Sequence, residues 1–106
     1  MAGFFLTGRA TADLKDIGRY TQRTWGAEQR DRYLGQLDAC FRRIAANPSV
    51  GLSSEALRPG YRRVHEGSHV IFYRRVGEDL EIVRVLHQSM LPEKHLKFAR
   101  PGCLSR

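Results

Sequence analysis

A dense group of arginines surrounds one apolar run in the second half of this chain. The stretch RPGYRRVHEGSHVIFYRR, residues 58–75, holds five arginines and one acid, Glu66, around the strand-forming residues 70–73. Guanidinium groups bind carboxylates and phosphates through paired N–H donors, so the cluster predicts contact with an acidic protein or a nucleic acid. The alternative is structural, because charge on a sheet edge prevents the strands of two molecules from pairing.

Other residue types that carry chemistry form no catalytic or metal-binding set. The sequence has no glycine-rich phosphate loop and no serine or cysteine nucleophile motif, and we expect no cofactor. Asp13 and Asp16 share the polar face of a predicted helix, where we expect solvation or a favourable interaction with the helix dipole. The histidines lack a tight metal-ligand spacing, so we predict no metal site. They are His65, His69, His87 and His95.

Arg84 interrupts an apolar strand pattern. It lies within LEIVRVLH, residues 80–87, where the neighbouring positions are apolar. A charged side chain in a central strand has to be paired or has to reach water past the sheet. We expect a salt bridge to an acid of a helix, with exposure on the second face of the sheet as the alternative.

The composition favours one basic domain over residues 1–106, with residues 91–106 as a C-terminal tail. The formal net charge is +7 and is spread over both halves, which favours acidic partners of any kind. No apolar stretch approaches the ~20 residues of a membrane span, and the N-terminus lacks a signal-peptide pattern. Two widely spaced cysteines form no disulfide framework, so we expect a cytoplasmic protein without membrane contact, in which Cys40 is buried.

Two helices and four strands are predicted to position these residues. Residues 4–6 form a short strand, Thr7 caps the first helix, Gly26 ends it, and Pro48 stops the second helix. Gly67 and residues 76–79 mark the turns of a meander over residues 61–66, 68–75 and 80–87. The order β-α-α-β-β-β predicts an α+β fold, an antiparallel sheet with a helical hairpin packed on one face. The apolar helix positions are Ala10, Leu14, Ile17, Thr21, Tyr33, Leu37, Cys40, Phe41 and Ile44.

The meander strands are apolar on both faces. Val70 and Phe72 alternate with Ile71 and Tyr73, and a sheet with helices on one face normally has polar residues on the other. The second face therefore needs a cover from the C-terminal segment or from a partner. In the last strand we expect Leu80, Ile82 and Leu86 to oppose Val83 and Val85, and Leu91, Leu96 and Phe98 to supply part of the cover.

The chain contains three motifs in order, LTGRATADLKDIGRYTQRTWG, LRPGYRRVHEGSHVIFYRR and IVRVLHQSM. Together they resemble the ParE group of toxins in the RelE/ParE superfamily of bacterial toxin–antitoxin systems, over about residues 4–96. The resemblance implies a toxin that is neutralised in a hetero-oligomer by a ParD-like antitoxin, whose C-terminal segment folds on the toxin. It also implies DNA gyrase as the target, blocked replication, and contact with DNA only indirectly through the antitoxin.

The sister RelE branch implies a different activity, ribosome-dependent cleavage of mRNA by lysines, arginines and a tyrosine or histidine near the C-terminus. Lysines are scarce in this chain, which has only Lys15, Lys94 and Lys97. RNA cleavage needs groups that activate the 2′-hydroxyl and stabilise the phosphate, and Arg62, Arg84 and His87 form only a partial set. We therefore favour a gyrase inhibitor that is not an enzyme. An mRNA endonuclease and a small basic nucleic-acid-binding module are the alternatives.

Two surfaces are the candidate sites. Large aromatic residues beside the apolar stripe of the helical hairpin are favoured interface anchors, although core packing is the alternative for them. The basic tail is a candidate target surface, with a frayed terminus as its alternative. We assign antitoxin binding to Tyr20, Trp25, Tyr33, Leu34, Leu37, Arg62 and Arg74, and target binding to Arg84, His87, Met90, Lys94, Lys97, Phe98 and Arg100.

Overall fold

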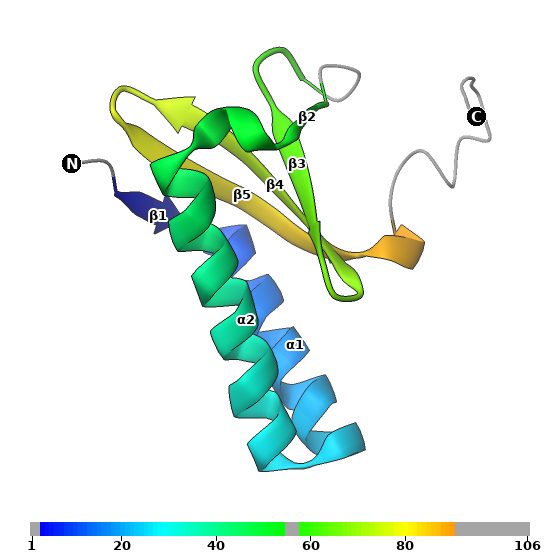
Figure 1. Cartoon of the computed structure of the whole chain (residues 1–106). Helices are drawn as coiled ribbons and strands as arrows, with labels where there is room; N and C mark the ends of the chain where they lie inside the picture. The colour runs from blue at the N-terminus through cyan, green and yellow to red at the C-terminus, as the bar shows by residue number, and fades with distance from the viewer. Residues whose placement is uncertain (1–2, 55–57, 91–106) are drawn as a thin grey trace.

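A computed structural model describes residues 3–54 and 58–90 of the chain (Figure 1). The predicted order of two helices and a three-strand meander is confirmed, and the structure adds one short strand and two 3₁₀ turns. The elements are β1 (Phe4–Leu6), α1 (Gly8–Trp25), α2 (Ala27–Ala46), η1 (Pro48–Val50), β2 (Leu52–Ser53), β3 (Arg62–Glu66), β4 (His69–Val76), β5 (Asp79–His87) and η2 (Gln88–Met90).

The five strands form one sheet in the order β1-β5-β4-β3-β2. Strands β3, β4 and β5 are antiparallel neighbours, as predicted, whereas β1 pairs with β5 in parallel. The sheet is therefore mixed, which corrects the expectation of an antiparallel sheet. The helical hairpin and the meander bring the last strand back beside the first, and both then run in the same direction. The two-residue strand β2 is too short to leave a sequence signal.

Local signals in the sequence set the ends of the helical hairpin. The Thr7 side chain accepts a hydrogen bond from the Ala10 backbone N–H and donates one to the Val83 carbonyl, so this cap also ties α1 to β5. Gly26 adopts φ +98° between the helices, a conformation that favours glycine. Figure 1 shows that the connected ends of α1 and α2 extend well beyond the sheet. Neither described helix is long and apolar enough to cross a membrane.

The main core lies between the helical hairpin and one face of the sheet. The predicted apolar faces of both helices are confirmed, and Leu37 and Cys40 are fully buried. Burial raises the pKa of the Cys40 thiol to about 11, so it stays protonated. The buried members of this core are Ala10, Ile17, Leu37, Cys40, Phe41, Ile44, Ile71, Tyr73, Leu80, Ile82 and Val85.

An irregularity in the pairing of β4 with β5 changes which residues face the helices. Phe72 lies opposite Arg84 whereas Tyr73 lies opposite Ile82, so Val83 is an extra residue. One extra residue reverses the alternation of side chains beyond it. Val85 therefore joins the core under the helices, and Leu86 packs on the opposite face against Val70 and Phe72. We predicted that Val85 shares a face of the sheet with Val83, and that Leu86 shares the other face with Leu80. Both predictions are wrong because of this extra residue. Leu91, Leu96 and Phe98 lie outside the described residues.

Candidate functional site

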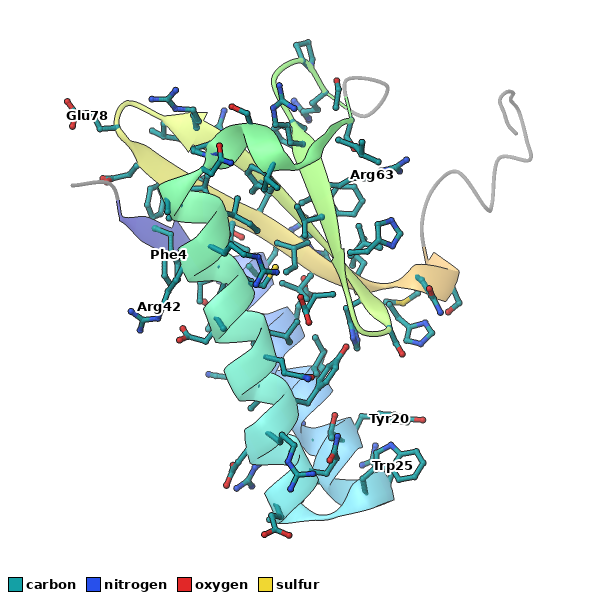
Figure 2. The ribbon with its side chains drawn as sticks, viewed as in Figure 1. Phe4, Tyr20, Trp25, Arg42, Arg63 and Glu78 are labelled. Atoms are coloured by element: carbon teal, nitrogen blue, oxygen red, sulfur yellow. The ribbon has the colours of Figure 1, made fainter. Side chains whose placement is uncertain are left out.

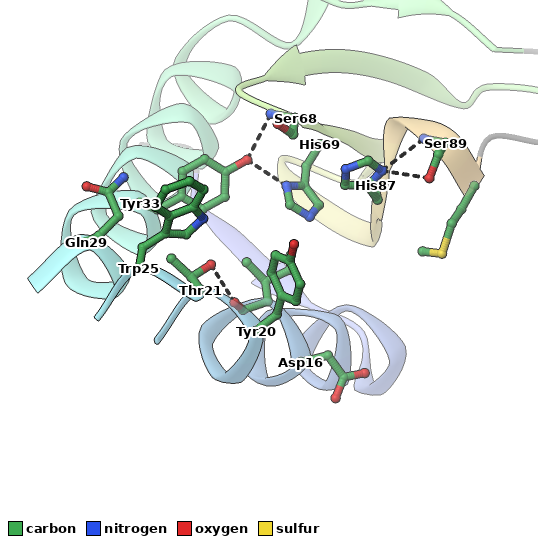
Figure 3. A pocket seen from close by; sticks show the side chains of 12 residues that line it. Asp16, Tyr20, Thr21, Trp25, Gln29, Tyr33, Ser68, His69, His87 and Ser89 are labelled. Carbon is green, nitrogen blue, oxygen red and sulfur yellow. Dashed lines mark hydrogen bonds between the residues drawn. The ribbon is translucent and has the colours of Figure 1, made fainter. Parts of the chain in front are cut away.

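A pocket of about 660 Å³ lies between the helical hairpin and the open end of the sheet (Figure 3). The two helices supply one wall, and the β3–β4 turn, the end of β5 and η2 supply the other. Segments that are distant in the sequence therefore meet around one hollow, which we call the hairpin pocket. Its lining residues are Asp16, Ile17, Tyr20, Thr21, Trp25, Gln29, Tyr33, Ser68, His69, His87, Ser89 and Met90.

Two aromatic side chains at the outer end of the hairpin pocket are open to solvent. Tyr20 is 59% exposed and Trp25 is 70% exposed. On α1 they flank Ile17 and Thr21, which face the core, so the helix carries them beside the buried stripe. Figure 2 shows both side chains on the same side of the far end of the hairpin. Exposed large aromatics beside a hollow are typical of protein-binding surfaces.

Tyr33 of α2 anchors the β3–β4 turn at the floor of the hairpin pocket. Its hydroxyl accepts a hydrogen bond from the Ser68 backbone N–H at 3.1 Å and lies 2.6 Å from Nδ1 of His69. The turn residue Gly67 has φ +59°, and a Cβ atom there would lie 2.6 Å from the Tyr33 hydroxyl. Burial raises the pKa of Tyr33, so the phenol stays protonated. Tyr33 is thus structural as well as pocket-lining.

Two histidines continue this contact toward the end of β5. The rings of His69 and His87 meet edge to face with centroids 5.4 Å apart, and the His87 Nδ1 lies 2.8 Å from the Ser89 hydroxyl. Burial lowers the pKa of His69, and neighbouring His87 lowers it further. His69 is therefore neutral at pH 7. Among the described residues, no three histidine, cysteine, aspartate or glutamate side chains are grouped to hold a metal.

Arg84 forms a two-pronged salt bridge with Asp13 of α1, as predicted for a helix acid. Its Nε and Nη2 donate to the two carboxylate oxygens at 2.8 and 3.0 Å. Asp13 also accepts the Val85 backbone N–H at 3.0 Å, beyond the point where β1 stops pairing with β5. We expected Asp13 to be solvated or to interact with the helix dipole. This expectation is wrong, because the Asp13 side chain is only 13% exposed and binds Arg84. Asp16, by contrast, is exposed and pairs with Arg19.

Three arginines, Arg62, Arg74 and Arg84, bind different parts of the protein. Arg62 donates to the Gly51 carbonyl at 2.7 Å, and Arg74 pairs with Glu81 across the strands at 2.6 Å. Arg62 therefore points toward the segment after α2, whereas Arg84 points toward α1. The three guanidinium groups therefore form hydrogen bonds within the domain. Arg62, Arg84 and His87 do not surround one position where a phosphate could bind.

The residues that we assigned to antitoxin binding and to target binding are divided between the hairpin pocket, the core and residues outside the described part of the chain. The hairpin pocket unites Tyr20, Trp25 and Tyr33 from the antitoxin set with His87 and Met90 from the target set. Leu37 is fully buried in the core and out of a partner's reach in this conformation, and Leu34 packs half-buried beside it. The remaining target residues, Lys94, Lys97, Phe98 and Arg100, lie outside the described residues.

The hairpin pocket also contains residues that we did not assign to either binding surface from the sequence. Asp16 and Gln29 line it from the helices, and Ser68 and His69 line it from the β3–β4 turn. His69 stands out in the sequence only as a histidine beside a turn, and Tyr33 lies 36 positions away from it. No local spacing encodes such a contact, because it depends on how α2 packs on the sheet.

Comparison with known proteins identifies the family. The model of the family described as "ParE toxin of type II toxin-antitoxin system, parDE" matches residues 4–92. This chain belongs to the ParE toxin family. Toxin ParE1 of Caulobacter vibrioides is 50% identical over 96 residues, covering 91% of this chain and 99% of that protein. Toxin ParE1 of Mycobacterium tuberculosis strain H37Rv is 42% identical over 94 residues, covering 88% and 96%.

Solved structures share the fold of this ParE toxin. The chromosomal ParDE toxin–antitoxin system from P. aeruginosa gives a TM-score of 0.69 at 19% identity, covering 82% of this chain and 95% of that chain. The E. coli DinJ–YafQ complex gives 0.53 at 16% identity, covering 86% and 98%. At these identities the likeness extends to the fold alone. The family match confirms a type II toxin of ParE type, and such a system includes an antitoxin as partner.

Proposed function

We propose that this ParE toxin binds DNA gyrase, blocks replication without catalysing a reaction, and is neutralised in the cytoplasm by a ParD-like antitoxin. The observation that carries the proposal is the family match over residues 4–92. Residues 1–106 act as one toxin domain, and DNA is contacted only through the antitoxin. Curated relatives that cover nearly the whole chain at up to 50% identity also carry the name ParE toxin, which supports the gyrase branch.

The positions of the arginines favour binding over RNA cleavage. A ribonuclease site needs cationic and acid–base groups that surround one phosphate. Here Arg84 is held by Asp13 and Arg62 by the Gly51 carbonyl, on different parts of the sheet. His87 instead hydrogen-bonds to Ser89 beside the hairpin pocket. Because these three side chains are held by separate partners, they favour a surface that binds its target over a site that cleaves RNA.

The antitoxin docks on the hairpin pocket, with Tyr20 and Trp25 as anchors. Their exposure makes them available to a partner without any loss of core packing. Tyr33 and Leu34 border this surface, and Arg62 and Arg74 attract the acidic segment of the antitoxin from the sheet. We remove Leu37 from the surface, because a fully buried side chain stabilises the fold and contacts no partner.

A supercoiling assay tests the gyrase proposal. Purified toxin is titrated into gyrase with relaxed plasmid, and separately into translating ribosomes with a reporter mRNA. We expect the toxin to abolish supercoiling or to trap cleaved DNA. Because the toxin acts by binding, the toxin concentration needed for inhibition should rise in proportion to the gyrase concentration. Intact mRNA is expected in the second reaction. Catalytic cleavage of ribosome-bound mRNA with gyrase unaffected would move the protein to the RelE branch.

Variants at exposed apolar positions test the two surfaces. Trp25→Ala is expected to weaken antitoxin binding by at least about tenfold, since a central aromatic anchor contributes about 2 kcal/mol or more. Leu52→Ala is the matched control, because Leu52 is also 64% exposed but lies on the far edge strand β2. Met90→Ala tests target binding and should weaken gyrase inhibition; because Met90 also lines the hairpin pocket, the antitoxin affinity of this variant is measured alongside. Equal antitoxin affinity for the Trp25 and Leu52 variants would place the antitoxin elsewhere.

A further inference from the structure

The short strand β2 covers only part of its neighbour β3 (Figure 1). It pairs with Arg62 and Arg63, whereas the pairing of β3 with β4 continues to Glu66. Among the described residues, Val64, His65 and Glu66 therefore have no strand beside them on the β2 side. Because an open strand edge offers its backbone groups to another chain, this end of β3 is a place where a partner strand can pair.

The turn after β3 determines which backbone groups point outward. Glu66 pairs with His69 across the two-residue turn at Gly67, and a pair that closes such a turn exchanges hydrogen bonds. Hydrogen-bonded pairs alternate along an antiparallel ladder, so Val64 also bonds to β4 and His65, between them, does not. The N–H and C=O of His65 therefore point toward the open edge.

A small hollow lies beside this open edge, between the end of α2, η1 and the strands β2 and β3. Its volume is about 220 Å³, below the roughly 300–1,000 Å³ that is usual for small-molecule sites. It therefore has room for side chains of a bound segment rather than for a whole cofactor. We call this hollow the edge notch. Its described lining residues are Arg43, Ile44, Val50, Leu52, Arg63, Val64 and His65.

The edge notch combines exposed aliphatic side chains with positive charge. Val50 and Leu52 are both more than half exposed. Arg43 and Arg63 line the same hollow, and no aspartate or glutamate is among its described lining residues. Glu66 lies beside it and pairs with Arg43 at 3.3 Å, which offsets only part of this charge. A segment that carries apolar and acidic side chains matches both features of the edge notch.

The same charges argue against a second copy of this chain as the occupant. Pairing two copies through this edge would bring the arginines of both together, and each chain carries a net charge of +7. An acidic strand has the opposite charge and gains hydrogen bonds to the His65 backbone. A nucleic acid matches the arginines but neither the exposed aliphatic side chains nor the open strand edge.

We propose that the edge notch binds an extended acidic segment of the toxin's target, which adds to β3 as a further strand. Its backbone bonds to His65, its apolar side chains contact Val50 and Leu52, and its carboxylates pair with the arginines. The identification of this partner as the target rests on the proposed function, in which the antitoxin occupies the hairpin pocket. The edge notch is a separate surface, since the two hollows have no described lining residue in common.

His65→Pro tests the backbone contact, because proline lacks the N–H that faces the edge and is tolerated in strands where this N–H faces solvent. His65→Ala is the matched control, since it removes the same side chain and keeps the N–H. For the same growth arrest, we expect the proline variant to need about two- to tenfold more toxin than the alanine variant, the effect of one backbone hydrogen bond. Equal potency of the two folded variants would overturn the proposal.

A pair of substitutions at Leu52 tests the charge and does not depend on how β3 tolerates proline. Leu52→Glu and Leu52→Lys both replace an exposed apolar side chain by a charged one, so they differ chiefly in sign. The glutamate variant should be the less toxic of the two, because it repels an acidic strand. Antitoxin affinity should change much less than toxicity. A parallel loss of antitoxin binding would place the antitoxin at the edge notch and overturn the assignment to the target.

A peptide probe separates this proposal from the gyrase assignment. A short peptide of alternating glutamate and valine is added to the purified toxin, with a lysine–valine peptide as the control. Only the acidic peptide should slow hydrogen exchange of the His65 N–H. Slowing by a DNA or RNA oligonucleotide and not by the acidic peptide would overturn the proposal in favour of a nucleic-acid site. A slowed His65 N–H with gyrase unaffected by the toxin would refute the proposed function and leave the acidic-strand site intact.

Discussion

Replacing Asp13 with alanine tests whether one helix acid holds the end of the sheet. The substitution removes two charge-assisted hydrogen bonds to Arg84 and the acceptor of the Val85 N–H. A buried donor left without a partner costs about 1–3 kcal/mol, and breaking a fully buried ion pair costs about 3–5 kcal/mol. Arg84 is 33% exposed, so water compensates part of the loss. We expect Asp13→Ala to lower the free energy of unfolding by about 2–3 kcal/mol.

Urea unfolding of the purified toxin measures this loss, with Asp16→Ala as the matched control. Asp16 lies one turn later on α1 and also pairs with an arginine, but both partners of that pair are exposed. Exposed pairs contribute about 0–1 kcal/mol, so this variant should unfold close to the wild type. Asp13→Asn keeps an oxygen for the Val85 N–H and should fall between the two. Equal losses for Asp13→Ala and Asp16→Ala would refute the reasoning.

Three further changes address packing, backbone and pH. Leu37→Ala should cost about 2–5 kcal/mol in urea unfolding, because Leu37 is fully buried; a small loss would return it to the binding surface. Gly51→Ala should lower the melting temperature, because the added Cβ would overlap the Tyr73 hydroxyl. Gly35→Ala is the control, because no atom lies within 4 Å of the added Cβ. This second variant should stabilise α2 by about 0.5–1 kcal/mol. The pKa of His69 is lowered from 6.5, so its contribution to stability is present above that value and is lost as pH falls toward the folded-state pKa. His69→Gln should flatten the decline in unfolding free energy below about pH 6.5, measured by urea titration at several pH values.

Asp13, which forms the salt bridge with Arg84, and Asp16, which lines the hairpin pocket, lie one turn apart on α1. The two acids have different roles. Asp13 holds β5 at the level where β1 stops, and Asp16, one turn further along, faces the pocket. The start of α1 therefore stabilises the sheet through Asp13, whereas the far end of the hairpin leaves Tyr20 and Trp25 exposed. This division explains how exposed aromatics are tolerated at the tip, because the core does not depend on them.

The sequence by itself determined the elements whose signals are local. A cap at Thr7, a break at Gly26, a stop at Pro48 and apolar residues at helical spacing all act within a few residues, so both helices were predicted close to their observed ends. The turn at Gly67 was likewise predicted from residue type. The family motifs lie on these elements, which is why fold and family could be inferred together.

The tertiary structure decided the contacts between distant residues. Asp13 meets Arg84 across 71 positions, and the sequence indicated a helix acid without selecting which one. The extra residue at Val83 reversed the faces of Val85 and Leu86, because the bulge depends on pairing with β4 and has no local signature. The same holds for the parallel pairing of β1 and for the hairpin pocket, whose lining comes from three separate parts of the chain. Local backbone preferences specify elements, whereas the packing of the helices on the sheet specifies which side chains meet.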